Sequence, residues 1–281
     1  DNGPEDLAGM CDGLPEYGVT GFLPTVSPRV MGEDARFVDA LSEIESHGAH
    51  ILGFHLEGPF LSYTGALPPE ALGEADPERV HSLIEAAQPY RAVFSIAPDF
   101  EGVEDLIPIM RDSGPVFMTH TGAGVEETRA AIEAGARHAT HFYDVYPAPP
   151  ESDPGVRPCG AVEAVLADPR VTVDFILDGE HVHPVAVQMA LQCKGIDGVS
   201  LITDANVGAG LPAGRYTGIG ARDVVFEYDG APARIDDGSE QDGALAGSGL
   251  TLDRAMRNAV EMLEMFLSDA VQMASTSPAR V

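Results

Sequence analysis

The sequence predicts an α/β protein with the architecture of a TIM-like (β/α)8 barrel. Short β-branched and apolar runs alternate with amphipathic stretches along the chain, which is typical of βα units and a parallel sheet. The 281 residues, of which 44% are hydrophobic, are enough to bury one large core. The 31 glycines and 22 prolines suit a fold with many tight connections between strands and helices.

Seven segments have the composition and length of buried strands. Each is short, apolar and rich in β-branched or aromatic residues. A barrel of this type needs eight strands, so either the first strand precedes residue 1 in the natural protein or one strand escapes the pattern. The predicted strands cover residues 18–25, 50–60, 92–99, 115–121, 138–144, 171–179 and 198–205.

Amphipathic stretches between these strands predict the helices. Residues 32–46, 125–134 and 184–193 have this character, and a further helical pattern begins near Pro4. The last predicted helix, residues 251–266, carries an apolar face through Leu252, Ala255, Met256, Val260 and Leu263.

One segment after the last predicted strand breaks this alternation. Asp229-Gly230 lies between two apolar runs, and Asp-Gly in that position is a strong hairpin signal. We interpret the segment as a small β-hairpin insertion near residues 216–236. Residues 1–281 are therefore predicted to form a single barrel-shaped catalytic domain.

The balance of charges limits the partners of the protein. Asp and Glu number 45 against 16 Lys and Arg, which gives a formal net charge of −29. Such a surface repels nucleic acids and anionic membranes, so we expect neither as a partner. No apolar run is long enough to cross a bilayer, and no secretory signal opens the chain. The acidic surface, with Lys194 as its single lysine, suits both a salt-rich cytoplasm and an ordinary acidic cytosolic enzyme.

The cysteines indicate the compartment. Cys11, Cys159 and Cys193 are scattered and form neither a CxxC pair nor a disulfide framework. A reducing cytoplasm is therefore the predicted location.

Ionisable side chains recur at the carboxyl ends of the predicted strands. The carboxyl ends of barrel strands converge on one mouth, where the catalytic groups of this fold lie. Side chains that are far apart in the sequence should therefore meet there. The five residues in question are Glu57, His120, His141, His181 and Asp204.

Three of these residues have the chemistry of a metal centre. Glu57, His120 and His141 offer two imidazoles and one carboxylate, which bind Zn²⁺ with a position left open for water. We predict one divalent metal, Zn²⁺, although the same ligands suit Fe²⁺, Mn²⁺ or Co²⁺. Asp204 can then take a proton from the water and return it to the leaving group, while His181 can orient or polarise the substrate.

Each candidate also has an ordinary structural explanation. A single histidine in a strand is more often a satisfied core group than a ligand, and an aspartate at a strand end often caps the next helix. Glu57 is the sharper signal, because a carboxylate within an apolar strand is costly without a partner. The recurrence at strand ends favours a site. His55, His181 and His183 stay open between a structural role and ligation, and His138 is expected to pack.

Six short motifs follow one another along nearly the whole chain. The HLEGP motif, a THxx(N/D) pattern and the TDA motif are fairly specific together, whereas DGxHV alone is weak. In this order the motifs resemble those of the N-acetylglucosamine-6-phosphate deacetylase family in the amidohydrolase superfamily. They are GVTGFLPT (18–25), GFHLEGPF (53–60), GARHATHFYD (135–144), DGEHVHP (178–184), LITDA (201–205) and ALAGSGLTLDRAMRN (244–258).

The resemblance implies a metal-dependent amidohydrolase barrel. In this family the chain continues into a flanking β-sandwich, and both that sandwich and the first barrel strand are expected to be missing here. The resemblance assigns zinc to Glu57, His120 and His141, makes Asp204 the general base and then the acid, and lets His181 contact the substrate. It also implies hydrolysis of an acetamide to acetate and a free amine, by an enzyme that is commonly a homodimer.

The predicted substrate-binding region departs from the family pattern. Leu67 stands where the family has a histidine that helps to polarise the carbonyl. Asp144-Val145 replaces an Asn-Ala pair that helps to hold the sugar phosphate, and a carboxylate at this position repels phosphate. Arg157 is displaced along the loop that carries the family's phosphate-binding arginine. We therefore predict that Asp144, Val145 and Arg157 contact the substrate in a divergent way.

These observations predict a deacetylase of an N-acetylated amino sugar, foremost N-acetylglucosamine-6-phosphate. One alternative is an amidohydrolase that acts on an unphosphorylated N-acyl or cyclic amide. Another, of a different class, is a non-catalytic barrel that binds a metal and a metabolite. Asp204 argues against the last, because a binding protein has no need of a proton shuttle there.

Overall fold

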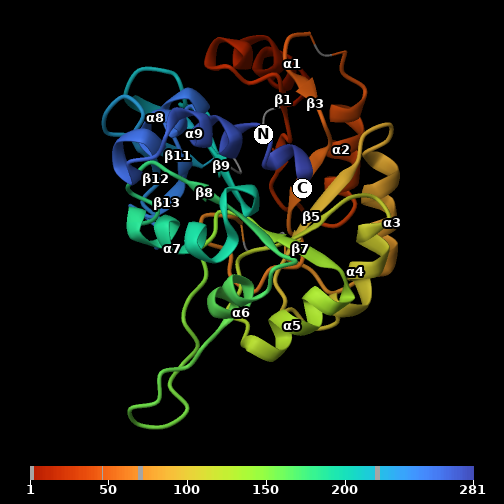
Figure 1. Cartoon of the computed structure of the whole chain (residues 1–281). Helices are drawn as coiled ribbons and strands as arrows, with labels where there is room; N and C mark the ends of the chain where they lie inside the picture. The colour runs from red at the N-terminus through yellow and green to blue at the C-terminus, as the bar shows by residue number, and fades with distance from the viewer. Residues whose placement is uncertain (1–2, 46, 69–71, 219–221) are drawn as a thin grey trace.

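One curled parallel sheet dominates the computed structural model, which describes residues 3–45, 47–68, 72–218 and 222–281 (Figure 1). Its seven strands follow the chain in the order β2-β4-β5-β6-β7-β8-β9, and all neighbouring pairs are parallel. The predicted parallel sheet of βα units is thus confirmed. The strands are β2 (Thr25–Val26), β4 (Phe54–Glu57), β5 (Ala92–Ile96), β6 (Val116–Met118), β7 (Ala136–Ala139), β8 (Thr172–Ile176) and β9 (Val199–Ile202).

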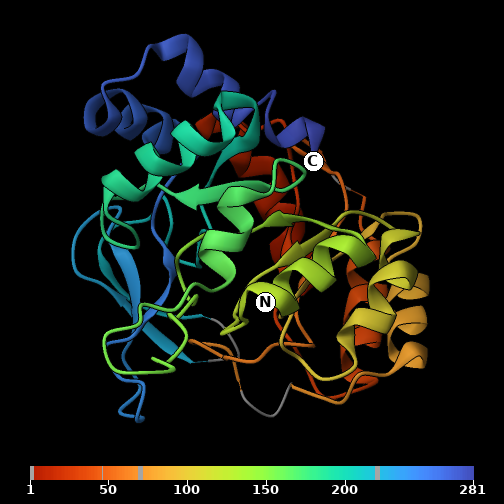
Figure 2. The same cartoon turned by 60° about the horizontal axis from the view of Figure 1, so that its bottom comes forward.

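Helices connect the strands and cover the outside of the sheet (Figure 2). None of the described helices is long and apolar enough to span a membrane. Short 3-10 turns lie at Leu14–Tyr17, Ile196–Gly198 and Pro278–Arg280. The helices are α1 (Pro4–Gly13), α2 (Glu33–Ser42), α3 (Pro77–Ala86), α4 (Val103–Arg111), α5 (Val125–Ala134), α6 (Ala161–Ala167), α7 (Pro184–Lys194), α8 (Leu252–Leu263) and α9 (Leu267–Ala274).

Helix α3 shows how the sequence specifies these elements. The Asp76 carboxylate accepts a hydrogen bond from the backbone N–H of Glu78 at 2.8 Å, and Pro77 occupies the first helical position. Val80 and Leu83 then recur at helical spacing and are buried against the sheet. The helix therefore starts at its cap and is held by one apolar face.

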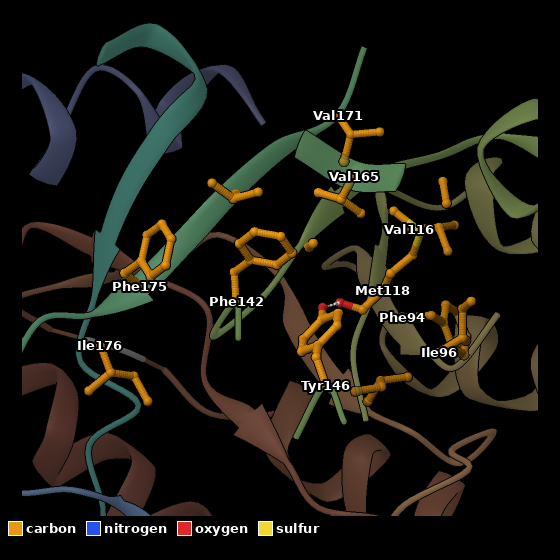
Figure 3. Packing of buried hydrophobic residues seen from close by; sticks show 14 of the residues in the cluster. Phe94, Ile96, Val116, Met118, Phe142, Tyr146, Val165, Val171, Phe175 and Ile176 are labelled. Carbon is orange, nitrogen blue, oxygen red and sulfur yellow. Dashed lines mark hydrogen bonds between the residues drawn. The ribbon is translucent and has the colours of Figure 1, made fainter. Parts of the chain in front are cut away.

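The strands are buried on both faces, so they lack the alternation of a half-exposed strand. All five residues of β5 are buried, because helices cover one face and the barrel interior covers the other. Figure 3 shows this packing, in which Phe142 lies beside Phe175 with ring centroids 5.9 Å apart. The Tyr146 hydroxyl donates to the Met118 carbonyl, so its polar end is satisfied within the core.

A second, antiparallel sheet of four strands follows β9. It contains the predicted hairpin near 216–236, of which residues 219–221 lie outside the described part of the chain. Gly230, with φ 81°, turns the chain between β11 and β12. The sheet extends beyond the hairpin because β13 pairs with β12 after an acidic loop. Its strands are β10 (Gly214–Thr217), β11 (Asp223–Phe226), β12 (Pro232–Ile235) and β13 (Leu245–Ser248).

The first two predicted strands are each divided in two. β1 (Gly21–Phe22) pairs in parallel with β3 (His50–Ile51) in a separate two-stranded sheet. Their continuations, β2 and β4, pair within the large sheet. The carboxyl edge of the large sheet thus begins at β2 and β4.

Candidate functional site

The carboxyl edge of the parallel sheet brings together the three predicted metal ligands. Glu57 is the last residue of β4, while His120 and His141 each follow the end of a strand, β6 and β7. All three are buried, with 4–8% of their surface exposed. One potential ligand atom from each lies within 4.8 Å of the others.

The three side chains converge on one point. Nε2 of His120 and Nε2 of His141 each lie 3.0 Å from the same atom, Oε1 of Glu57. The two imidazole rings are nearly perpendicular, at 88°, with centroids 5.2 Å apart. This arrangement presents two ring nitrogens and a carboxylate oxygen to a common centre.

The hydrogen bonds of His120 show that these donors fit a cation. Its Nδ1 lies 2.8 Å from the Tyr63 carbonyl and therefore carries the ring proton. With Nδ1 protonated, Nε2 can face the Glu57 carboxylate in two ways: as a second N–H, or as a lone pair with a cation between the two atoms. One divalent metal provides that cation for both histidines.

The electrostatics of the site also favour positive charge. Burial by itself raises the pKa of Glu57, but hydrogen bonds from His120 and His141 hold it well below its usual range. Burial lowers the pKa of His141, yet its hydrogen bond to Glu57 and the charge of that carboxylate raise it to about 10. Without a metal the site therefore holds protons between the carboxylate and the rings, and a divalent cation can take their place.

Backbone conformation marks the same edge independently. Among the described residues, six non-glycine residues have positive φ, a region that costs L-residues about 1–2 kcal/mol each. Five of the six lie at strand ends around the candidate site. They are His120 (45°), His141 (31°), Tyr143 (78°), Val145 (51°) and Asp204 (44°).

Asp174 in β8 supports His141 and was not identified from the sequence. Its carboxylate accepts hydrogen bonds from the backbone N–H of His141 at 2.5 Å, from His138 Nε2 at 2.8 Å and from the Thr140 hydroxyl at 3.0 Å. These bonds hold the left-handed backbone of His141 in place. The signal that identified Glu57, a carboxylate within an apolar strand, applies equally to Asp174.

Asp99 supports the segment after His120 in the same manner. It accepts hydrogen bonds from the Thr121 hydroxyl at 2.5 Å and from the Gly122 backbone N–H at 3.2 Å. A carboxylate therefore supports the backbone at or beside each metal-candidate histidine: Asp174 in β8 and Asp99 in the loop after β5. These contacts fix the segments that carry the two ligands.

Asp204 follows β9 and is partly exposed at the mouth of the site. Burial of its carboxyl group and the negative charge of Glu57 raise its pKa to about 6. A carboxyl group with a pKa close to neutrality can both accept and donate a proton. Its backbone is held by the Ser248 N–H, which donates to the Asp204 carbonyl at 2.8 Å.

His181 carries a buried nitrogen that lacks a partner. Its Nδ1 lies 2.7 Å from Oδ2 of Asp178, whereas Nε2 has no hydrogen-bond partner within the described part of the chain. Burial lowers the pKa of His181, but Asp178 raises it above its usual value, with added effects from Asp144 and Asp204. The ring is therefore oriented by Asp178 and has one nitrogen available to a ligand.

The remaining three substrate-binding candidates lie in two different places, two near the metal group and one on an exposed loop. The negative charge of Asp144 acts on His141 and Asp204, which places it near the metal group. Val145 lies close to Gly65, where a Cβ on that glycine would be 3.2 Å from Val145 Cγ1. Arg157 is exposed on the long loop between β7 and α6, which extends away from the body (Figure 1).

Three other histidines have structural partners. His55 lies between the hydroxyls of Thr25 and Ser95, at 3.0 and 2.5 Å. His138 bonds to Asp174, and His183 Nδ1 accepts the Val185 N–H at 3.2 Å at the start of α7. These contacts account for all three residues without ligation.

Comparison with known proteins shows that the chain is similar to amino-sugar-phosphate deacetylases. The chain is 33% identical over 290 residues to N-acetylgalactosamine-6-phosphate deacetylase of Escherichia coli O157:H7, covering 100% of this chain and 72% of the relative. It is 34% identical over 271 residues to N-acetylglucosamine-6-phosphate deacetylase of Vibrio furnissii, covering 93% and 64%. The chain thus spans 64 to 72% of the length of these two relatives.

Solved structures show the same likeness. N-acetyl-D-glucosamine-6-phosphate deacetylase from Mycobacterium smegmatis superposes with a TM-score of 0.83 at 29% identity, covering 96% of this chain and 71% of that one. A mutant of that enzyme in complex with N-acetyl-D-glucosamine-6-phosphate gives a TM-score of 0.80 at 30% identity, covering 94% and 68%. No family model matches the chain.

Proposed function

Because the chain belongs to the N-acetylglucosamine-6-phosphate deacetylase family, we propose that it removes the acetyl group from a 6-phosphorylated N-acetylhexosamine, foremost N-acetylglucosamine-6-phosphate. The observation that supports this proposal is the convergence of Glu57, His120 and His141 beside Asp204. We propose that residues 1–281 form one catalytic domain.

The proposed cofactor is one Zn²⁺ ion held by Glu57, His120 and His141. A metal bound there supplies Lewis acidity to the amide carbonyl and to water. The hydrogen bond from His120 to Tyr63 and the contacts of Asp174 around His141 keep the ligands in place.

Asp204 moves the proton in the proposed reaction. Its carboxylate takes a proton from the attacking water as the new C–O bond forms at the acetyl carbon. The same proton then goes to the amine nitrogen as the C–N bond breaks, which yields acetate and the free amine. A pKa of about 6 suits both steps, because neither protonation state of Asp204 is strongly disfavoured near neutral pH.

Four further residues are proposed to bind the sugar phosphate. His181, oriented by Asp178, offers Nε2 to the substrate. Asp144 and Val145 lie beside the metal group, where the negative charge of Asp144 suits a sugar hydroxyl better than a phosphate. Arg157 is the proposed phosphate ligand, delivered by the long loop before α6.

The decisive experiment measures acetate release by the zinc-loaded protein from N-acetylglucosamine-6-phosphate, N-acetylgalactosamine-6-phosphate and unphosphorylated N-acetylglucosamine. We expect turnover of a phosphorylated sugar and a much weaker reaction without the phosphate. Arg157→Gln should raise KM for the phosphorylated sugar alone, whereas Arg129→Gln, an exposed arginine on α5, should leave KM unchanged. Metal binding without acetate release from any of the three sugars would contradict the proposal.

We further propose a homodimer in the cytoplasm. The family resemblance supports the dimer, and three free cysteines suit a reducing compartment. Light scattering at several protein concentrations tests the dimer, and a mass of 29.6 kDa throughout would contradict it.

A further inference from the structure

The chain after β4 reaches across the site and holds His120. Residues 62–67 form this segment, which we call the strap. The backbone N–H groups of Ser62 and Tyr63 both donate to the His120 carbonyl, at 3.2 and 3.1 Å. In return, His120 Nδ1 donates to the Tyr63 carbonyl at 2.8 Å. The strap therefore contacts this histidine at both its backbone and its ring.

Gly65 lets the strap lie directly against the imidazole. Its φ of 55° is in the left-handed region, and a Cβ there would lie 3.1 Å from His120 Cε1 and 3.2 Å from Val145 Cγ1. Any larger residue would push the strap away from the ring. The contact between strap and ring therefore depends on glycine at this position.

The far side of the strap is attached to the small antiparallel sheet. Ala66 is buried in the apolar core of that sheet, together with Val224 and Phe226. Nε2 of Gln241 donates to the Gly65 carbonyl at 2.6 Å, and Nη1 of Arg222 donates to the Ala66 carbonyl at 3.3 Å. Arg222, just before β11, and Gln241, in the loop between β12 and β13, thus bind consecutive carbonyls of the strap.

Arg222 is itself held rigidly. Its Nε donates to Asp237 and its Nη2 to Ser239, both at 2.7 Å, and its Nη1 also donates to the Gln241 side chain. The hydrogen bond from Arg222 holds the pKa of Asp237 well below its usual range, so that carboxylate stays charged. The guanidinium is therefore fixed where it meets the strap.

We propose that Arg222 and Gln241 are positioning residues for the metal ligand His120, acting through the strap. The inference rests on the proposed metal-binding role of His120. Because the Tyr63 carbonyl of the strap accepts from Nδ1, the ring proton is kept on that nitrogen. Nε2, which lies 3.0 Å from Glu57 Oε1, would then offer its lone pair to a metal bound there. Loss of such supporting contacts typically lowers metal affinity about 10- to 100-fold.

The test compares metal binding in Gln241→Ala and Arg222→Gln with that of the parent protein. Affinity for Zn²⁺ is measured by competition with a chelator, and the absorption spectrum of the Co²⁺-loaded protein reports ligand geometry. Arg234→Gln is the matched control, because this arginine of the same sheet donates to the Gly243 carbonyl and not to the strap. We expect about 10-fold weaker Zn²⁺ binding and an altered Co²⁺ spectrum in both test variants. The control should have the Zn²⁺ affinity and the Co²⁺ spectrum of the parent. Without metal, all variants should unfold at a temperature similar to that of the parent.

Two outcomes overturn the inference in distinguishable ways. If both test variants have the Zn²⁺ affinity and the Co²⁺ absorption spectrum of the control, the strap does not position His120. A parent protein that binds no metal overturns the proposed metal site itself. If Arg222→Gln or Gln241→Ala fails to fold, Gly65→Ala tests the same contact, since its methyl group displaces the strap from the ring. Parent-like metal binding by Gly65→Ala would equally overturn the inference.

Discussion

The carboxyl edge of the parallel sheet and the small antiparallel sheet bury side chains of opposite character. The edge buries ionisable groups, Glu57, His120 and His141, whose partners are other polar groups. The small sheet buries apolar groups such as Phe226 and Ile235. Burial alone therefore does not distinguish a site from a core, because the chemistry of the buried groups differs.

The two regions also differ in backbone strain. Five of the six described non-glycine residues with positive φ lie around the candidate site, and none lies in β10–β13. Strain and buried charge lower stability and persist where they position reacting groups. The edge therefore has the strain and buried charge of a reactive site, while the small sheet contributes stability and holds the strap.

The largest expected effect is on activity at the edge. Asp204→Asn keeps the shape of the side chain and tolerates its φ of 44°, but it cannot accept the proton of the attacking water. We expect acetate release to fall by about 10²- to 10⁴-fold with no loss of folding stability. Steady-state acetate assays and thermal unfolding measure the two quantities.

The control for that variant is Asp105→Asn, at an exposed position of α4. It removes the same charge without touching the edge, so its activity should stay close to that of the parent. Equal losses in both variants would show that Asp204 has no special role in proton transfer.

The next effect concerns stability in the small sheet. Phe226 is 3% exposed and packs edge-on against Tyr216, with centroids 5.8 Å apart. Phe226→Ala should lower the free energy of unfolding by about 3–5 kcal/mol through lost packing and a cavity. Denaturant unfolding measures this change.

The control is Thr217→Ala, at an exposed position of the same sheet. It should change the free energy of unfolding by much less than Phe226→Ala does. A small effect of Phe226→Ala on the free energy of unfolding would show that the small sheet contributes little stability, contrary to our expectation.

A buried histidine near the edge should make stability depend on pH. Burial lowers the pKa of His55 to about 4 despite the opposing charge of Glu57, whereas an unfolded histidine has a pKa of about 6.5. Between these values the unfolded chain binds a proton that the folded chain excludes. Stability is thus full above pH 6.5 and falls as the pH is lowered toward 4, by about 3 kcal/mol.

The measurement compares the free energy of unfolding against pH for the parent and His55→Gln, both free of metal. Other titrating groups are common to the two proteins, so the difference between the curves reports His55. Parallel curves over this range would contradict the low pKa of the buried ring.

The smallest effect tests strain outside the site. Glu264 ends α8 with φ 55° and is exposed, so Glu264→Gly should stabilise the fold by up to about 1 kcal/mol and leave activity unchanged. Glu264→Ala keeps the strain and should give no gain. A loss of activity in the glycine variant would show that this strain, too, serves the site.

The sequence by itself specified the elements of the large sheet and the metal candidates. Short apolar runs alternating with amphipathic stretches identified all seven strands, because burial on both faces leaves a local signature. Glu57, His120 and His141 stood out because ionisable groups at apolar strand ends are costly without a common purpose. Asp229-Gly230 likewise marked a turn through its own backbone preference.

Which distant groups support the site depends on how the strands and loops pack in three dimensions. Gln241 and Gly65 are 176 residues apart, and Asp174 and His141 are 33 apart, so no local pattern connects either pair. Their contacts depend on strand order, register and the pairing of β13 with β12. Local propensity determines elements within a few residues. The hydrogen bonds that hold His120 and His141 form only once the strands have paired and the strap has been placed between the two sheets.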